Sequence, residues 1–251
     1  MLAAAAAGAI AAQPAVASNR MLVAHIAGAV AVAHPPAQIA APTRTGGATL
    51  AGIVDPTWAR ARAGRGARVW FVGLATAWSG EPQVLLVLGS GEYRGRHWLR
   101  VLLPIRPDGT SGWIPRNDAV LIHTASWIAV DTTARTVSIY RHGKLLHRFA
   151  AVIGKPTTPT PDGLAAIYEI DRQPDPSGFL GPWALPLTVF SNVLFNFGGG
   201  PGQVAIHGRG GASLIDPLGS AASHGCIRID NGPISWMASH LSRGTPVEIT
   251  G

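Results

Sequence analysis

Short apolar runs separated by glycine and proline dominate the first half of the chain after about residue 53. They lie at residues 69–72, 84–88, 98–103 and 112–114. Runs of this length, bounded by turn residues, are typical of β-strands, and their close spacing predicts a small all-β unit. The pair Asp108-Gly109 between the last two runs predicts the turn of a hairpin.

The second half alternates apolar and polar positions and is rich in β-branched residues. Residues 127–131 and 136–140 are followed by a His142-Gly143 turn and a third run at 145–152, a pattern that predicts hairpins. Further strands are predicted at residues 165–170, 187–190, 204–206, 227–229 and 247–249. The pattern therefore predicts a mainly β fold in both halves.

One helix is predicted, directly after residue 230. Asp230 or Asn231 can cap its amino terminus, and Pro233 suits its first turn. Its apolar face comprises Ile234, Met237, Ala238 and Leu241. We expect this helix to brace the preceding segment from behind.

The amino-terminal segment, residues 1–52, is interpreted as two apolar runs and a flexible linker. The runs occupy residues 1–12 and 21–33, and Ala-Val-Ala triplets at 15–17 and 31–33 have the form of a signal-peptidase site. We therefore expect an exported protein of the cell-wall space, with a signal peptide or an amino-terminal membrane anchor. Residues 34–52, rich in Ala, Pro, Gly and Thr, are expected to be unstructured up to about Ile53.

The composition limits the kinds of partner that we expect for this protein. Hydrophobic residues make up 47% of the chain and charged residues 13%, which argues against wholesale disorder. Twenty basic and thirteen acidic residues give a formal charge of +7, which draws a protein toward anionic surfaces such as cell-wall polymers. The basic residues are spread along the chain without interleaved aromatics, so nucleic acid is not expected as a partner.

The strongest chemical signal surrounds the single cysteine, Cys226. It ends the run Ser223-His224-Gly225-Cys226, and a second histidine, His207, lies upstream in an Ile-His-Gly segment. A thiol becomes a useful nucleophile when a base takes its proton and nearby dipoles stabilise the thiolate. One cysteine also excludes an internal disulfide.

This arrangement resembles the L,D-transpeptidase catalytic domain family of the YkuD type, bacterial enzymes of cell-wall biogenesis and cell shape. The family signature is Ile-His-Gly, about fifteen residues, then Ser-His-Gly-Cys followed by an apolar residue and Arg, here Arg228. The likeness runs from about residue 127 to 249 and includes the closing Gly-Thr-Pro-Val-Glu-Ile segment. The resemblance implies a β-sandwich catalytic domain at residues 126–251 with one or two short helices.

The resemblance also implies the central roles. Cys226 is the expected nucleophile and His207 the general base, giving a thiolate and imidazolium pair. Family members orient this imidazole with the carbonyl of the next residue, here Gly208, so no acidic third member is expected. No metal, nucleotide or organic cofactor is expected.

Four neighbouring residues have supporting roles with alternatives left open. His224 and Ser223 are expected to assist the nucleophile or only to hold its loop. The amides of Gly225 and Cys226 are expected to face the developing oxyanion. Arg228 is expected to bind a substrate carboxylate or to keep the thiolate ionised, and a purely structural arginine is the alternative.

The reaction comes from the resemblance alone. Such enzymes acylate their cysteine with a peptidoglycan tetrapeptide stem, and an amine of another stem resolves the thioester into a 3-3 cross-link. Water would give L,D-carboxypeptidase activity, and a lipoprotein side chain would give anchoring. Carbapenems are the expected covalent inhibitors.

Two further segments carry hypotheses. The loop at residues 171–186, with Phe179 and Trp183, is a candidate lid in which Trp183 contacts substrate, or an ordinary surface loop with Trp183 packed inward. Residues 98–114 resemble the end of a bacterial SH3-like β-barrel, which predicts such a domain at residues 53–125. It is expected to contact the wall or to serve as a spacer.

Three rival functions differ in testable ways. Zinc could be held by His207, His224 and Cys226, but no ligand-spaced motif such as HExxH is present in the sequence. A papain-like or NlpC-type hydrolase places its cysteine before its histidine, the reverse of this order. A non-catalytic wall-binding protein would have no need of the intact thiol motif.

Overall fold

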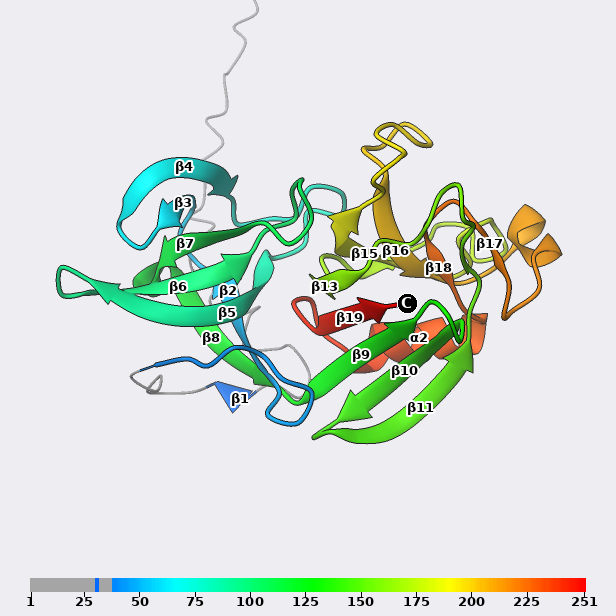
Figure 1. Ribbon diagram of the computed structural model, residues 1–251, viewed down its shortest axis with the longest axis horizontal. Helices are drawn as coiled ribbons and strands as arrows, with labels where there is room; N and C mark the ends of the chain where they lie inside the picture. The colour runs from blue at the N-terminus through cyan, green and yellow to red at the C-terminus, as the bar shows by residue number, and fades with distance from the viewer. Residues whose placement is uncertain (1–29, 32–37) are drawn as a thin grey trace, which may run out of the picture.

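The computed structural model describes residues 30–31 and 38–251, and two β-rich parts lie side by side in it (Figure 1). The apolar runs and signal-peptidase sites of the sequence analysis lie almost entirely outside the described residues. Among the described residues, none of the helices is both long and apolar enough to cross a bilayer.

The amino-terminal part is built around an eight-stranded sheet with the order β1-β8-β2-β5-β6-β7-β3-β4. A short 3-10 helix, η1 (Arg116–Asp118), precedes its last strand. The strands are β1 (Val30–Ala31), β2 (Ala48–Ile53), β3 (Thr57–Arg62), β4 (Arg65–Val72), β5 (Val84–Tyr93), β6 (Arg96–Leu102), β7 (Ser111–Pro115) and β8 (Ala119–Thr124).

The sequence located four of these strands and the hairpin between β6 and β7, in which Gly109 has a φ of 77°. The expectation of an unstructured segment up to residue 52 is wrong from Ala48 onward, because β2 pairs with both β5 and β8. Leu50 and Ala51 in it are fully buried. The likeness to an SH3-like barrel stays a prediction.

The carboxy-terminal part contains two larger sheets, which lie on the right in Figure 1. A five-stranded sheet has the order β11-β10-β9-β19-β13, a four-stranded sheet the order β14-β15-β16-β18, and β12 pairs with β17. The elements are β9 (Ser126–Asp131), β10 (Thr136–Arg141), β11 (Lys144–Ala150), β12 (Ile153–Gly154), β13 (Gly163–Ala166), β14 (Asp171–Arg172), β15 (Trp183–Phe190), β16 (Gln203–His207), η2 (Gly211–Ile215), β17 (Ala221–Ser223), β18 (Ile227–Arg228), α2 (Asn231–His240) and β19 (Pro246–Thr250).

One apolar core joins the two larger sheets and α2. It contains Ile128 and Val130 of β9, Leu185 and Leu187 of β15, and Ile234 of α2, all fully buried. The predicted helix is confirmed, and its apolar face packs onto this core. Because side chains alternate along a strand, the opposite face of the four-stranded sheet is left for other uses.

Two predicted strands differ in their bounds. The strand predicted at residues 187–190 begins earlier, at Trp183. Residues 165–170 were expected to form a single strand, but β13 ends at Ala166 and Ile167 makes only an isolated bridge to Leu187. Tyr168 and Glu169 both donate their backbone N–H groups to the Pro186 carbonyl of β15, so the regular strand pairing ends here. The Glu169 carboxylate accepts from the backbone N–H groups of Trp78 and Ser79 at 2.9 Å each.

The two parts share an apolar interface. Leu50, Leu86 and Ile122 of the amino-terminal sheet are buried in one cluster with Ala166 of β13. Burial of this kind stabilises by about 25 cal/mol for each Å² of apolar surface removed from water. The relative placement of the two parts is therefore fixed by packing as well as by the chain that connects them.

Candidate active site

The site lies on the outer face of the four-stranded sheet. In the parallel pair β16 and β18, Ile206 lies opposite Ile227 and His207 opposite Arg228. Ile206 and Ile227 point into the core. By alternation His207 and Arg228 share the outer face, and Cys226, two residues before Arg228, joins them there. The β-strand register therefore brings together the two residues that the sequence placed far apart.

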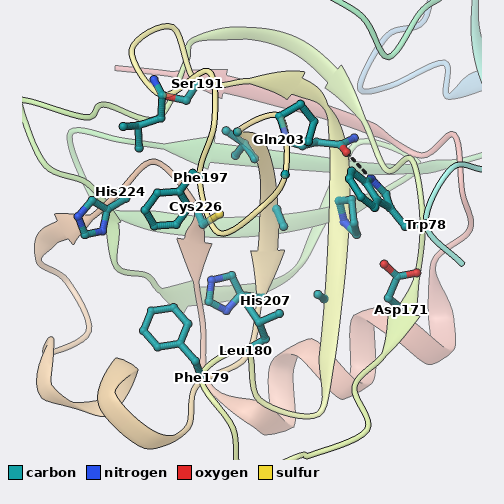
Figure 2. A pocket seen from close by; sticks show the side chains of 18 of the residues that line it. Trp78, Asp171, Phe179, Leu180, Ser191, Phe197, Gln203, His207, His224 and Cys226 are labelled. Carbon is teal, nitrogen blue, oxygen red and sulfur yellow. Dashed lines mark hydrogen bonds between the residues drawn. The ribbon is translucent and has the colours of Figure 1, made fainter.

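These side chains line one cavity of about 510 Å³. Cys226 is half-buried at its floor, and Figure 2 shows the thiol, His207 and His224 in the same hollow. The remaining wall comes from β15, from the loops at residues 173–182 and 191–202, and from Trp78 of the amino-terminal part. The cysteine and both histidines thus line one cavity, and their catalytic roles stay predictions.

His207 is 1% exposed, and its ring is held by the chain itself. Its Nδ1 lies 2.7 Å from the carbonyl oxygen of Gly208, the contact expected from the family resemblance. A carbonyl only accepts, so Nδ1 carries the proton and Nε2 of the neutral ring is left as the acceptor nitrogen. The Gly208 N–H in turn donates to the Trp183 carbonyl at 3.1 Å.

Both reacting groups favour their neutral forms in the free protein. Burial lowers the pKa of His207 to about 4, with a smaller contribution from the charge of Arg228, against the opposing effect of the Gly208 and Leu180 backbone. Burial raises the pKa of the Cys226 thiol, although the Ala205 backbone and Arg228 act in the other direction. The expected thiolate and imidazolium pair is thus not the resting state.

A buried hydroxyl ties the loop before the nucleophile together. Ser223 is fully buried, its Oγ donates to the Cys226 carbonyl at 2.6 Å and accepts from the Gly225 N–H at 3.1 Å. Of the alternatives for Ser223, the structure favours holding the loop. The Gly225 amide, expected to face an oxyanion, is already engaged within the loop.

Two threonines of a second segment, residues 154–160, form hydrogen bonds to the same loop. Thr160 Oγ1 donates to the Gly225 carbonyl at 2.8 Å and accepts from the Gly154 N–H at 2.9 Å. Thr158 Oγ1 donates to the Ser223 carbonyl at 3.1 Å. Gly225 has a φ of 117°, a backbone conformation that side chains disfavour, so these contacts hold a turn that only glycine adopts readily.

Arg228 is almost completely buried beside the reacting groups. Its Nη1 pairs with Asp216 Oδ2 at 2.6 Å, and its guanidinium carbon lies 4.8 Å from the centre of the Phe179 ring. The sequence left a structural role and an electrostatic role open. The ion pair supports the first, and the effect of Arg228 on the pKa of Cys226 supports the second.

His224 is exposed at the rim of the same cavity. Its ring stacks on Phe197, with centroids 5.2 Å apart and planes inclined by 29°. Phe197 belongs to the loop at residues 191–202, so His224 contacts a part of the cavity that the sequence analysis did not consider. This contact favours a loop-fixing role over assistance to the thiol.

Trp183 lies outside the catalytic cavity, and its expected substrate contact there is wrong. In β15 the neighbouring Ala184 lies opposite His207 and faces the cavity, so Trp183 points to the other side and packs against the core. Phe179 of the same segment does line the cavity and is 46% exposed. That this segment moves as a lid stays a prediction.

Sequence reasoning missed several contributors. Thr158 and Thr160 act through hydroxyls that contact residues 65 positions away, and Trp78 reaches the cavity from the other part of the chain. Only the Thr-Pro-Thr-Pro run at residues 158–161 was available as a local signal. Across residues 30–31 and 38–251, no three His, Cys, Asp or Glu side chains gather as a metal-binding group.

Comparison with known proteins agrees with the motif. Residues 125–249 match the L,D-transpeptidase catalytic domain family, YkuD. A Bacillus licheniformis protein described as an L,D-transpeptidase YkuD is 34% identical over 123 residues, and a Bacillus subtilis protein of the same description is 31% identical over 122. Each alignment covers 49% of this chain, and the chain spans 64% of the length of each relative.

Solved structures of similar proteins include the catalytic domain from an E. faecium L,D-transpeptidase acylated by ertapenem. It is 23% identical, with 51% of this chain and 98% of that chain covered and a TM-score of 0.38. An L,D-transpeptidase from Mycobacterium smegmatis is 17% identical, with 78% and 99% covered and a TM-score of 0.42. On the strength of the family match and the curated relatives, the chain belongs, through residues 125–249, to the L,D-transpeptidase catalytic domain family of the YkuD type.

Proposed function

We propose that this domain is a peptidoglycan L,D-transpeptidase that forms 3-3 cross-links through an acyl-enzyme on Cys226. One observation carries the proposal. Cys226 and His207 occupy the same face of one cavity, and the Nδ1 contact with the Gly208 carbonyl leaves Nε2 as the basic nitrogen. Family membership supports the reaction class, and the geometry supports this choice of nucleophile and base.

In the first step the Cys226 thiol attacks the carbonyl carbon of the third residue of a donor tetrapeptide. The S–H bond breaks as the sulfur–carbon bond forms, and the proton passes to Nε2 of His207. Both groups are neutral before substrate binds. His207 therefore becomes charged only as the sulfur bonds to the substrate carbonyl. The terminal D-alanine then leaves as an amine that takes the proton from His207.

The tetrahedral intermediate carries a negative oxygen that needs donors. The Cys226 amide is the loop donor we assign to it, since the Gly225 amide already donates to Ser223 Oγ. The buried Arg228 adds positive charge to the same region. A charge that develops in a site shielded from water is stabilised more strongly than one in bulk solvent.

In the second step the amine of an acceptor stem attacks the thioester carbonyl. His207 takes the proton from this amine as the new amide bond forms. It then gives that proton to the sulfur as the sulfur–carbon bond breaks, so Cys226 returns to the thiol. Water can enter the same step and give carboxypeptidase activity. The wall at residues 191–202 and Phe179 is apolar on the side of the cavity, which disfavours water relative to a bound stem.

The proposed function also implies where the protein acts and which polymers it contacts. The substrate is a polymer outside the membrane, which fits an exported or membrane-tethered protein of the cell wall. The formal charge of +7 favours contact with anionic wall polymers and adds to substrate attraction at low salt.

The proposal is tested by mass spectrometry on the intact chain. A carbapenem is expected to add one equivalent to the wild type and none to Cys226→Ala. His207→Ala is expected to lose acylation, whereas His224→Ala is expected to slow it less, because His224 lies at the rim. Absence of any adduct on folded wild-type protein would overturn the proposal, and equal loss in both histidine variants would overturn the choice of base.

A further inference from the structure

We propose that Arg106, in the amino-terminal β part, is a positioning residue for the catalytic cavity. It holds the loop at residues 191–202, which we name the roof loop, in place above Cys226. The inference rests on the proposed acyl transfer for one of its readouts. It means that the amino-terminal part is a working component of the active site and not only a spacer.

The roof loop connects β15 to β16 and projects from the sheet, as the gold segment at the top of Figure 1 shows. It lines the catalytic cavity with residues from both of its arms and from its tip. The lining residues are Ser191, Leu194, Phe197, Gly200, Pro201 and Gly202. Where the roof loop lies therefore decides how open the cavity is.

The loop is closed at its base by the bond from the Ser191 N–H to the Gly202 carbonyl at 2.8 Å, but its tip has few contacts of its own. Phe195 is 67% exposed and Phe197 50% exposed, and the tip contains three consecutive glycines. Its internal bonds include the pair between Phe197 and Gly200 and two bonds from backbone N–H groups to Ser191 Oγ. A glycine-rich tip with exposed aromatics needs an external support to stay in one place.

Arg106 provides that support with one side chain. Its Nη1 donates to the Pro201 carbonyl at 2.9 Å, and its Nη2 donates to the carbonyls of Ser191 at 2.7 Å and Leu194 at 3.3 Å. These carbonyls lie on both arms of the roof loop. The planar guanidinium, with several donors in a fixed fork, is suited to bridging them at once, and a lysine is not.

Arg106 also contacts aromatic rings at the roof loop. The guanidinium carbon of Arg106 lies 4.8 Å from the centre of the Phe190 ring and 4.9 Å from that of Phe195. Two residues along the chain, Asp108 Oδ1 accepts from the Phe190 N–H at 2.9 Å. The turn between β6 and β7 thus grips the base of the roof loop at several points.

The amino-terminal part reaches the roof loop from a second direction. Trp78 Nε1 donates to Gln203 Oε1 at 2.8 Å, at the end of the roof loop, and Trp78 itself lines the cavity (Figure 2). The Trp78 backbone is fixed by the buried carboxylate of Glu169, as described above. Arg106 and Trp78 therefore both connect the amino-terminal part to the roof loop or its end.

The position of the roof loop reaches the catalytic motif through Phe197. Its ring stacks on His224, two residues before Cys226. If Arg106 is removed, we expect the roof loop to sample open positions, the stack to loosen and the cavity to fill with water. Productive substrate binding then weakens, and the thiol becomes more accessible to small reagents.

The test compares Arg106→Ala with Arg106→Lys and with Arg100→Ala. Arg100 is an exposed arginine of the same part whose side chain donates to Ser111 Oγ of β7 at 2.9 Å, so it controls for lost charge. Two rates are measured on the full chain: alkylation of Cys226 by iodoacetamide, and acylation by a carbapenem as a function of its concentration. Thermal unfolding is measured for each variant.

We expect Arg106→Ala to raise the concentration needed for half-maximal acylation about tenfold, the effect of losing about 1.4 kcal/mol of closure. The maximal acylation rate should change much less, and alkylation should become faster. Arg106→Lys should resemble Arg106→Ala, and Arg100→Ala the wild type. Phe197→Ala should reproduce the shift, and the double variant should add nothing to it.

Each outcome of this test supports or overturns the role of Arg106. Wild-type acylation with an unchanged concentration dependence in Arg106→Ala overturns the inference, as does full additivity of Arg106→Ala and Phe197→Ala. Should Arg106→Ala unfold, the Arg106→Lys and Phe197→Ala pair gives the same comparison in folded protein. If the wild type itself is not acylated, the proposed function fails, and the alkylation rates still report whether Arg106 holds the roof loop closed.

Discussion

The hydrogen bonds between Thr160 and the nucleophile loop give a quantitative prediction about one hydroxyl group. Replacing Thr160 by Val keeps the β-branched shape and removes only the Oγ1 that bonds both to the Gly225 carbonyl and to the Gly154 N–H. Thr160 is 6% exposed, so neither backbone group can easily turn to solvent. We expect the variant to fold with a weakened and mispositioned nucleophile loop.

The magnitude follows from the number of groups left without a partner. A buried polar group that loses its hydrogen bond costs about 1–3 kcal/mol, and Thr160→Val leaves two such groups. The expected loss in the free energy of unfolding is therefore about 2–6 kcal/mol. Thr158→Val removes one bond, to the Ser223 carbonyl, and is expected to cost about 1–2 kcal/mol.

Thr157 supplies the matched control, because it is exposed in the same short run. Thr157→Val is expected to stay within about 0.5 kcal/mol of the wild type. The assay is urea denaturation followed by tryptophan fluorescence, with carbapenem acylation rates on the same samples. A Thr160→Val variant as stable and as reactive as Thr157→Val would refute the claim that this segment holds the nucleophile in place.

Three further predictions concern titratable and charged side chains. Because the pKa of His207 is about 4 and that of Cys226 is raised, the acylation rate should rise with pH through about 4 and then stay level to above pH 8; a limb near 6.5 would contradict this. The pKa of Asp171 is raised to about 7, by burial first and then by Glu169, so the fold holds a proton that the unfolded chain releases, and stability falls from about pH 4 to 7. Asp171→Asn should therefore raise the melting temperature relative to the wild type at pH 8 and not at pH 4, and an equal gain at both would count against it. Removing the partner of the buried Arg228 with Asp216→Asn should cost about 1–3 kcal/mol in urea denaturation, and no loss would show that the ion pair is dispensable.

The sequence predicted those parts of the fold whose pattern is local. Apolar runs bounded by turns located β5, β6 and β15, and the proline and the apolar face located α2. The expected cap was wrong, because the side chain of the N-cap residue Asp230 makes no capping hydrogen bond. It missed β2, because Ala48–Ile53 is short, small-sided and follows a Pro- and Gly-rich segment, and only pairing with β5 and β8 makes it a strand. It missed β3 because arginines alternate along Thr57–Arg62.

The site divides in the same way. Cys226, His207 and the Gly208 carbonyl were predictable from a motif whose members lie on adjacent strands. Contacts made by tertiary packing were not. Arg106 lies 85 to 95 residues from the three carbonyls that it binds, and nothing local distinguishes it from the other arginines of the amino-terminal part. The error over Trp183 came from taking residues 171–186 as one loop: Trp183 begins β15, where alternation turns its side chain away from the cavity.

The central claim is that the sulfur of Cys226 receives the acyl group of a peptidoglycan stem with His207 as its base. The most direct measurement incubates the full chain with a disaccharide tetrapeptide and follows protein and products by mass. The account predicts release of D-alanine, a thioester on Cys226 that His207→Ala does not form, and a product in which two third residues are joined. An unmodified cysteine and an intact tetrapeptide, with the protein folded, would contradict it.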